Sequence, residues 1–294
     1  ESEGRMFPVE IVHSRTDADE RNAAEAVAAA VRAAHSRHEG DILAFLPGEA
    51  DIRRCAEILG SALGTTRVFP LYGMLSPVEQ RSAIAPSREG ERKVVLATPI
   101  AETSITIEGV RVVVDSGLCR KMVYDPQRGL SRLETVRISK DMASQRSGRA
   151  GRVAPGVCYR LWSLATEKLM AENRRPEILE ADLAPLLLDI LSWGGAGIGE
   201  LPWLTAPPAY GVEQASKLLE TLGAVDADGK LTQYGRKMAA YPCHPRLANM
   251  FLRAASSEDK ALAADIAALL EDKDPLPEEG ADINLRLAAL YSAR

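Results

Sequence analysis

The first half of the chain alternates short apolar runs with longer amphipathic stretches. Strands are predicted where β-branched and other apolar residues cluster: 42–46, 66–69, 93–97 and 111–114. Helices are predicted before the first strand, over 19–37, and between the strands, over 49–60 and 76–84, the last opened by Ser76-Pro77. Such alternation is typical of a mostly parallel sheet covered by helices. The pattern therefore predicts an α/β domain.

The segment 119–138 interrupts this alternation. Two short runs, 121–124 and 131–138, flank Asp125-Pro126-Gln127-Arg128-Gly129, which is a turn sequence typical of a β-hairpin. An antiparallel hairpin on a parallel sheet would protrude from it. Taken alone, the hairpin is either a surface elaboration or a functional arm.

Beyond Trp162 the pattern becomes helical, and Arg174-Arg175-Pro176 is a candidate boundary. The turn Asp226-Ala227-Asp228-Gly229 is consistent with a small wing. Helices are expected over six segments: 183–193, 212–222, 232–240, 245–255, 258–271 and 281–292.

The stretch 145–152, Gln-Arg-Ser-Gly-Arg-Ala-Gly-Arg, carries the strongest chemical signal. Arg149 and Arg152 are three residues apart, so on a helical turn they would point the same way. A guanidinium is a planar, permanently charged fork that fits phosphate oxygens. An isolated pair of this kind is more often an exposed basic helix end, so its meaning depends on the surrounding sequence.

Four stretches, in this order, resemble the second RecA-like domain of DEAH-box (DEAH/RHA) helicases: 41–48, 70–80, 94–107 and 145–152. Further segments are similar to that family's winged-helix domain and to the start of its ratchet domain: 183–194, 201–208 and 229–239. The segments 244–248 and 264–271 look most like the bacterial HrpB-like branch. The resemblance implies a RecA-like domain over 1–163, a winged-helix domain over 164–231 and the start of a ratchet domain over 232–294, which we expect to be incomplete.

The resemblance implies an ATP-dependent RNA helicase or translocase that couples ATP hydrolysis to movement along single-stranded nucleic acid and to unwinding. Arg149 and Arg152 correspond to the arginines that stabilise charge on the transferred phosphoryl group. Gln145 would orient the attacking water or touch the γ-phosphate. The hairpin corresponds to an arm that separates or guides strands.

The same resemblance assigns binding residues. Gly48, Thr98 and Thr103 match positions that contact the nucleic-acid backbone, where contacts position a strand without reading its sequence. Ser104, Thr106 and Glu108 match positions that contact the nucleotide. For the two threonines the alternative is helix or turn capping. The chain departs from many relatives at Glu108, where they have aspartate, and at Pro99, where they have asparagine.

The sequence contains neither Gly-x-x-x-x-Gly-Lys-Ser/Thr nor Asp-Glu-Ala-His. ATP and Mg²⁺ need the phosphate loop and acidic ligand that such motifs supply. In the family both lie in the first RecA-like domain. We therefore expect the chain to be a fragment that carries one wall of an ATP site, and we expect it to be inactive alone as an ATPase. Two alternatives remain: an RNA-binding module without activity, and DNA rather than RNA as the track.

The composition further limits the classes of protein and of site that are expected. The formal net charge of −5 is unusual for a nucleic-acid binder, but basic residues concentrate between 120 and 140. The four cysteines are far apart and the four histidines lack metal-ligand spacing, so we expect no disulfide and no metal site. There is no signal peptide pattern and no apolar run long enough for a bilayer. We expect a cytoplasmic protein that binds no membrane, and no oligomeric state is predicted. The three tryptophans are expected in cores.

Overall fold

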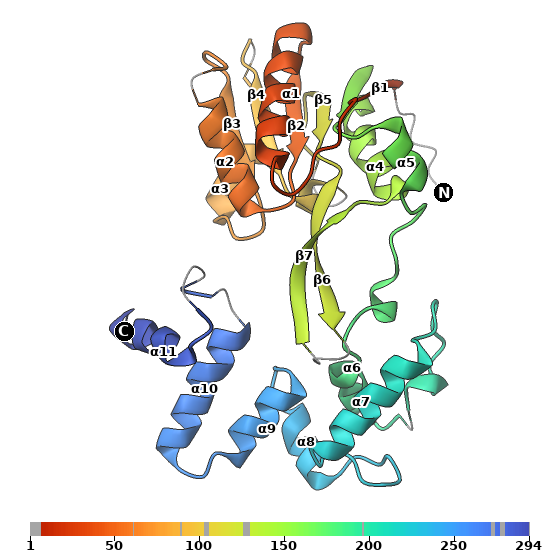
Figure 1. The fold of residues 1–294 in the computed structure, drawn as a ribbon, viewed down its shortest axis with the longest axis vertical. Coiled ribbons are helices and arrows are strands. Elements are labelled where there is room, and N and C mark those ends of the chain that lie inside the picture. The colour runs from red at the N-terminus through yellow and green to blue at the C-terminus, as the bar shows by residue number, and fades with distance from the viewer. Residues whose placement is uncertain are drawn as a thin grey trace. The chain divides into compact units, whose positions relative to one another are not determined.

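The structure is a computed structural model that describes residues 7–60, 62–88, 90–102, 106–125, 130–195, 197–271, 274–276 and 280–293. Its chain divides into two compact units. The first takes in the residues up to Val123 together with Arg132–Arg175, and the second takes in Tyr124–Ser131 together with the residues from Pro176 on. Figure 1 traces their elements along the chain.

The first unit is built on a six-stranded sheet in the order β1-β8-β5-β2-β4-β3, and every neighbouring pair is parallel. Its strands are β1 (Val9–His13), β2 (Asp41–Phe45), β3 (Arg67–Leu71), β4 (Lys93–Ala97), β5 (Val110–Asp115) and β8 (Gly156–Arg160). The predicted α/β architecture is confirmed. The helices of this unit are α1 (Ala23–Arg37), α2 (Glu49–Leu59), α3 (Pro77–Ile84), α4 (Lys140–Ser147) and α5 (Leu164–Leu169), with 3-10 turns η1 (Pro99–Ala101) and η2 (Gly148–Gly151).

Strands β1 and β8 were not expected from the sequence. They pair with each other, with Val9 opposite Gly156 and His13 opposite Arg160, and β1 forms one edge of the sheet. An edge strand needs less apolar surface than a central strand, so the polar residues of β1 weaken its sequence signal. Central strands such as β2 and β4 are fully buried and were predicted.

The two faces of the sheet pack against different partners, because successive side chains of a strand point to opposite faces. Ile42 and Ala44 of β2 lie in one core with Val27 of α1 and Ile52 of α2. Leu43 and Phe45 lie in the other core, which takes in residues of η1, the segment that follows it, and η2. The second face therefore carries the segments that the sequence analysis singled out.

The predicted hairpin is present. Strands β6 (Leu118–Asp125) and β7 (Leu130–Arg137) form a separate two-stranded sheet. They are antiparallel, because four residues are too few for the crossover that a parallel pair needs. The tip, 126–129, lies outside the described residues.

The first unit continues past 163, the predicted domain boundary, to residue 175. Helix α5 is tied to the sheet by Glu167, whose carboxylate accepts hydrogen bonds from Arg160 at 2.7 Å and from the indole of Trp162 at 3.0 Å. His13 Nε2 lies 2.5 Å from the same carboxylate. These contacts explain why the chain leaves this unit only after α5.

The second unit is helical. Its helices are α6 (Ala184–Ser192), α7 (Ala209–Thr221), α8 (Gln233–Ala239), α9 (Pro245–Arg253), α10 (Ser257–Glu271) and α11 (Ile283–Ala293), with 3-10 turns η3 (Glu177–Leu179) and η4 (Ile198–Glu200). One antiparallel bridge, Val225 to Leu231, frames the predicted wing turn. Leu187, Leu219 and Met238 share one core, so α6, α7 and α8 fold together. In the described part of the chain, no helix combines the length and apolar character that crossing a bilayer requires.

The expectation for the tryptophans holds in part. Trp162 is fully buried and Trp203 packs against the core of the second unit. The expectation was wrong for Trp193, which is 81% exposed. It follows the last residue of α6 and lies beyond the buried residues of that helix, the last of which is Ile190.

The core assignment predicts a contrast between two leucines of the first unit. Leu96→Ala should lower its free energy of unfolding by about 2–5 kcal/mol, because Leu96 is fully buried. Leu169→Ala should change it by less than about 0.5 kcal/mol, because Leu169 is 89% exposed. Urea unfolding followed by Trp162 fluorescence, in a background with Trp193→Phe and Trp203→Phe, measures both. Equal losses would contradict the core described here.

Candidate nucleic-acid and nucleotide site

The candidate site begins at the carboxyl edge of the parallel sheet. The last residues of β2, β4 and β5 lie in register, with Phe45 opposite both Ala97 and Asp115. Backbone hydrogen bonds extend this alignment into the loops: Leu46 N–H donates to Ala97 O at 2.9 Å, and Ser116 N–H to Phe45 O at 3.2 Å. Parallel sheets place ligand-binding loops at this edge.

The arginine stretch lies on α4 and η2. Ala150 of η2 packs against the face of the sheet that carries Leu43 and Phe45. The small residues of the stretch are needed for close packing. The carbonyl oxygen of Gly151 accepts a hydrogen bond from Phe7 N–H at 2.8 Å. A Cβ on Gly151 would overlap the Phe7 carbonyl oxygen. The glycine therefore lets the segment that leads into β1 approach η2.

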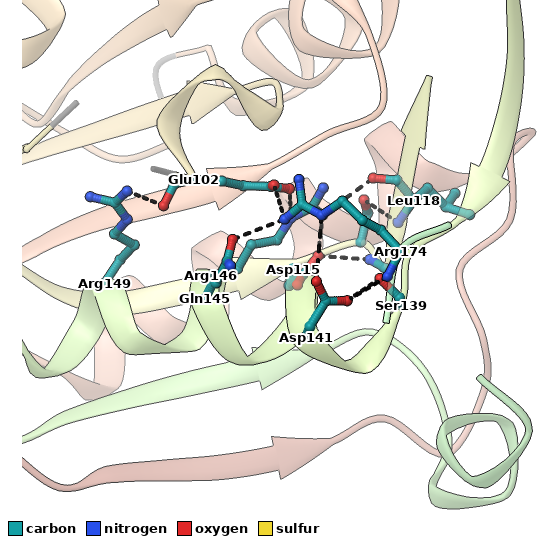
Figure 2. Close-up of polar contacts among 11 residues, drawn as sticks. Glu102, Asp115, Leu118, Ser139, Asp141, Gln145, Arg146, Arg149 and Arg174 are labelled. Carbon is teal, nitrogen blue, oxygen red and sulfur yellow. Dashed lines mark hydrogen bonds and ion pairs between the residues drawn. The ribbon is translucent and has the colours of Figure 1, made fainter. Parts of the chain in front are cut away.

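Arg146 is a fully buried charge of this region. Its side chain is fully buried, and Nε donates to Glu102 at 2.7 Å while Nη1 donates to Asp115 at 2.8 Å. Nη1 also donates to the carbonyl oxygen of Leu118 at 3.2 Å, at the base of the hairpin. The guanidinium lies 4.8 Å from the centre of the Phe45 ring. Figure 2 shows Arg146 between its two carboxylates.

These contacts determine the charge state of Arg146. Burial alone would lower the pKa of the guanidinium, but Asp115 and Glu102 outweigh that effect and raise its pKa above the usual value. Arg146 is therefore a permanent cation inside the protein. A buried charge of this kind is tolerated only when its partners are in place.

Arg146 was not singled out from the sequence. Two acids could have indicated it: Glu102 follows the buried Ala101, and Asp115 ends a buried strand. A carboxylate in such a position needs a cation. The sequence, however, does not show which arginine supplies it.

Glu102 joins the loop after β4 to the arginine stretch. Its carboxylate accepts from Arg146 and lies 3.4 Å from Arg174 Nη2. Its backbone carbonyl oxygen accepts a hydrogen bond from Arg149. One residue of the loop thus contacts three arginines (Figure 2).

Arg149 and Arg152 both reach this loop but differ in environment. Arg149 is buried, and burial together with the nearby charge of Arg152 lowers its pKa to about 10, so it stays protonated at neutral pH. Arg152 is exposed and donates to Thr106 Oγ1 at 2.6 Å. The two guanidinium groups therefore meet the loop at separate points, Glu102 and Thr106.

Comparison with known proteins identifies two known domains in this chain. Residues 22–154 match the helicase conserved C-terminal domain, and residues 217–243 match the winged-helix part of the helicase associated domain (HA2). The chain is 44% identical over 272 residues to the ATP-dependent RNA helicase HrpB of Escherichia coli (strain K12), a match that covers 92% of this chain and 33% of HrpB. It is 37% identical over 285 residues to the ATP-dependent RNA helicase HrpA of the same organism, covering 94% of this chain and 22% of HrpA.

A solved structure matches as well. The crystal structure of the Escherichia coli DEAH/RHA helicase HrpB aligns with a TM-score of 0.88 and 41% identity, over 97% of this chain and 36% of that one. The chain belongs to the DEAH/RHA helicase family. It spans about a third of the length of HrpB, the first of these relatives.

The remaining residues predicted for this DEAH/RHA site are distributed around the same edge. Thr98 is half-buried directly after β4, and Glu108 is exposed. Gln145 is exposed on α4 and accepts a hydrogen bond from Arg174 Nη2 at 2.9 Å. Thr103 and Ser104 lie outside the described residues. Their predicted contacts, like those of the other site residues, stay predictions.

Gly48 is buried at the start of α2, so little of it can touch a ligand. The side chain of the exposed Arg120 lies over it: a Cβ at Gly48 would come within 3.0 Å of Arg120 Nε. From the sequence, Gly48 was the residue of this loop that was predicted to contact the nucleic-acid backbone. The structure adds a guanidinium beside it, which is the better phosphate-binding group.

The buried network predicts different stability effects for two arginines of one stretch. Arg146→Met should lower the free energy of unfolding of the first unit by about 3–5 kcal/mol, because it leaves Glu102 and Asp115 buried without their shared cation. Arg152→Met should change it by less than about 0.5 kcal/mol, because Arg152 is exposed. Urea unfolding measures the difference. A loss below about 1 kcal/mol for Arg146→Met would contradict the network.

Proposed function

We propose that this chain is the second RecA-like domain, the winged-helix domain and part of the ratchet domain of an ATP-dependent RNA helicase. The full-length protein would couple ATP hydrolysis to movement along single-stranded RNA and to duplex unwinding. The proposal is carried by the hydrogen bonds that Glu102 accepts from Arg146 and Arg149. Through them, the loop that is expected to contact RNA and nucleotide is joined to the arginine stretch. The names of the relatives HrpB and HrpA support RNA as the track.

The arginine stretch would form one wall of the ATP site. Arg149 and Arg152 carry full positive charge and would stabilise negative charge that develops on the transferred phosphoryl group. Gln145, Ser104, Thr106 and Glu108 would complete this wall. The groups that hold Mg²⁺ and the phosphates would come from another part of the full-length protein, because this sequence contains no phosphate loop.

The RNA wall would lie at the same sheet edge. Thr98, Thr103 and the loop at Gly48 would bind the backbone of a single strand, with Arg120 as a further phosphate contact. The hairpin β6–β7 would guide or separate strands. Since backbone contacts read no sequence, a 2′-hydroxyl contact would be needed to distinguish RNA from DNA. We also propose a cytoplasmic location, which the four unpaired cysteines support.

The arginine assignment predicts a large catalytic defect. In the full-length protein, Arg149→Ala or Arg152→Ala should lower kcat for RNA-stimulated ATP hydrolysis on the order of 10³-fold, because charge on the phosphoryl group loses its stabilisation. The affinity for ATP should change much less. Steady-state phosphate release at varied ATP concentration, with RNA and DNA compared as activators, measures kcat for each variant.

The control in that experiment is the 294-residue chain alone, which we propose to be inactive as an ATPase. Phosphate release from the pure chain would contradict the proposed division of the ATP site. Near wild-type turnover of both arginine variants would show that this stretch is not the catalytic wall. Stronger activation by DNA than by RNA would change the proposed track.

A further inference from the structure

Gln145 has a side chain whose two ends differ. The amide oxygen can only accept hydrogen bonds and the amide nitrogen can only donate them. Rotation of the amide exchanges these ends, so an unrestrained glutamine presents either of them to a nucleotide. Gln145 is exposed on α4. The end of the amide that faces a nucleotide therefore depends on the groups that bind the other end.

Arg174 contacts that amide. Its Nη2 donates to Gln145 Oε1 at 2.9 Å. A guanidinium carries donors only, so it selects the oxygen end of the amide and leaves Nε2 as the end that points elsewhere. Figure 2 shows Arg174 approaching Gln145 from the segment that follows α5.

Arg174 is itself held in place. Its backbone N–H donates to Asp141 Oδ1 at 3.1 Å, and its side chain lies 3.5 Å from Asp141 Oδ2 and 3.4 Å from Glu102 Oε2. Asp141 and Gln145 are four residues apart on α4, so they share one face of the helix. Burial raises the pKa of Asp141, but hydrogen bonds from Ser139 and the backbone, with the charge of Arg174, bring its pKa below the usual value. Asp141 is therefore a carboxylate at neutral pH.

The segment around Arg174 is fastened to α4 by further bonds. The first backbone N–H groups of α4, at Lys140 and Asp141, donate to the carbonyl oxygens of Ala171 and Glu172 at 2.9 and 3.0 Å. Helix starts leave such donors without partners inside the helix, and here a neighbouring segment supplies them. An ion pair between Lys140 and Glu172 at 2.5 Å joins the same two segments.

We propose that Arg174 is a positioning residue that orients the amide of Gln145, so that Nε2 donates to the terminal phosphate of ATP. The inference rests on the proposed function. It also favours contact with the γ-phosphate over orientation of the attacking water, because Arg174 uses one of the two lone pairs of Oε1 and leaves the donor Nε2 as the end available to a phosphate oxygen. Arg174 touches neither substrate nor metal in this role.

A double-mutant cycle in the full-length protein tests the proposal. Arg174→Ala should lower kcat for RNA-stimulated ATP hydrolysis about tenfold, the effect of losing one charge-assisted hydrogen bond, with KM for ATP changed less than about twofold. Gln145→Ala should lower kcat at least as much. Adding Arg174→Ala to Gln145→Ala should cause no further loss, because Arg174 would then have nothing to orient.

Glu172→Ala is the matched control. It removes a further ion pair between the same segment and α4 and leaves the Arg174–Gln145 bond intact. Its kcat should stay within about twofold of wild type, as expected for an exposed pair. If Glu172→Ala slows turnover as much as Arg174→Ala, or if the Arg174 and Gln145 effects multiply, Arg174 merely fastens the segment and the proposal is wrong. Wild-type turnover of Gln145→Ala would instead overturn the role of Gln145 in the proposed function, and this inference with it.

Discussion

The first unit depends on one buried cation. Arg146 lies between Glu102 and Asp115 with no solvent exposure of its side chain. Taking three charges out of water is costly, and that cost is offset only when all three partners keep their geometry. The network therefore links three places that are distant in sequence: the loop after β4, the end of β5 with the base of the hairpin, and helix α4.

This linkage explains how two kinds of ligand could share one sheet edge. The loop that follows β4 contacts Arg149 through Glu102 and Arg152 through Thr106. Any displacement of that loop would move the hydrogen-bond partners of both arginines. Under the proposed function, such a connection would let a strand bound at the loop influence the arginines of the nucleotide site.

Much of the fold could be predicted from the sequence, because the strongest signals are local. Strands β2 and β4 are continuous apolar runs that end at recognisable loops, and the hairpin is marked by its own turn residues. Strand β1 was missed because an edge strand can keep polar residues and because its partner, β8, is far along the chain. Local patterns carry little information on such a pairing.

In the site, too, local sequence patterns identify some residues and long-range contacts determine the others. Arg149 and Arg152 could be singled out from the sequence, since their spacing and the resemblance to a family mark them, and their role at a phosphoryl group stays a prediction. Arg146 and Arg174 could not be singled out, because their roles come from Glu102, Asp115, Asp141 and Gln145, which only folding brings to them. Gly48 shows the reverse case: the sequence singled out the loop, and the structure adds the charged side chain of Arg120 beside it.

The most direct test of the account is the activation of ATP hydrolysis by RNA in full-length Glu102→Gln. Glutamine keeps the size and the backbone carbonyl of Glu102 but removes the charge that pairs with Arg146. The ratio of RNA-stimulated to basal turnover should fall severalfold, on the order of the loss of a charge-assisted hydrogen bond, in protein whose folding is confirmed by circular dichroism. An unchanged ratio in the folded variant would show that Glu102 does not connect the RNA wall to the arginines.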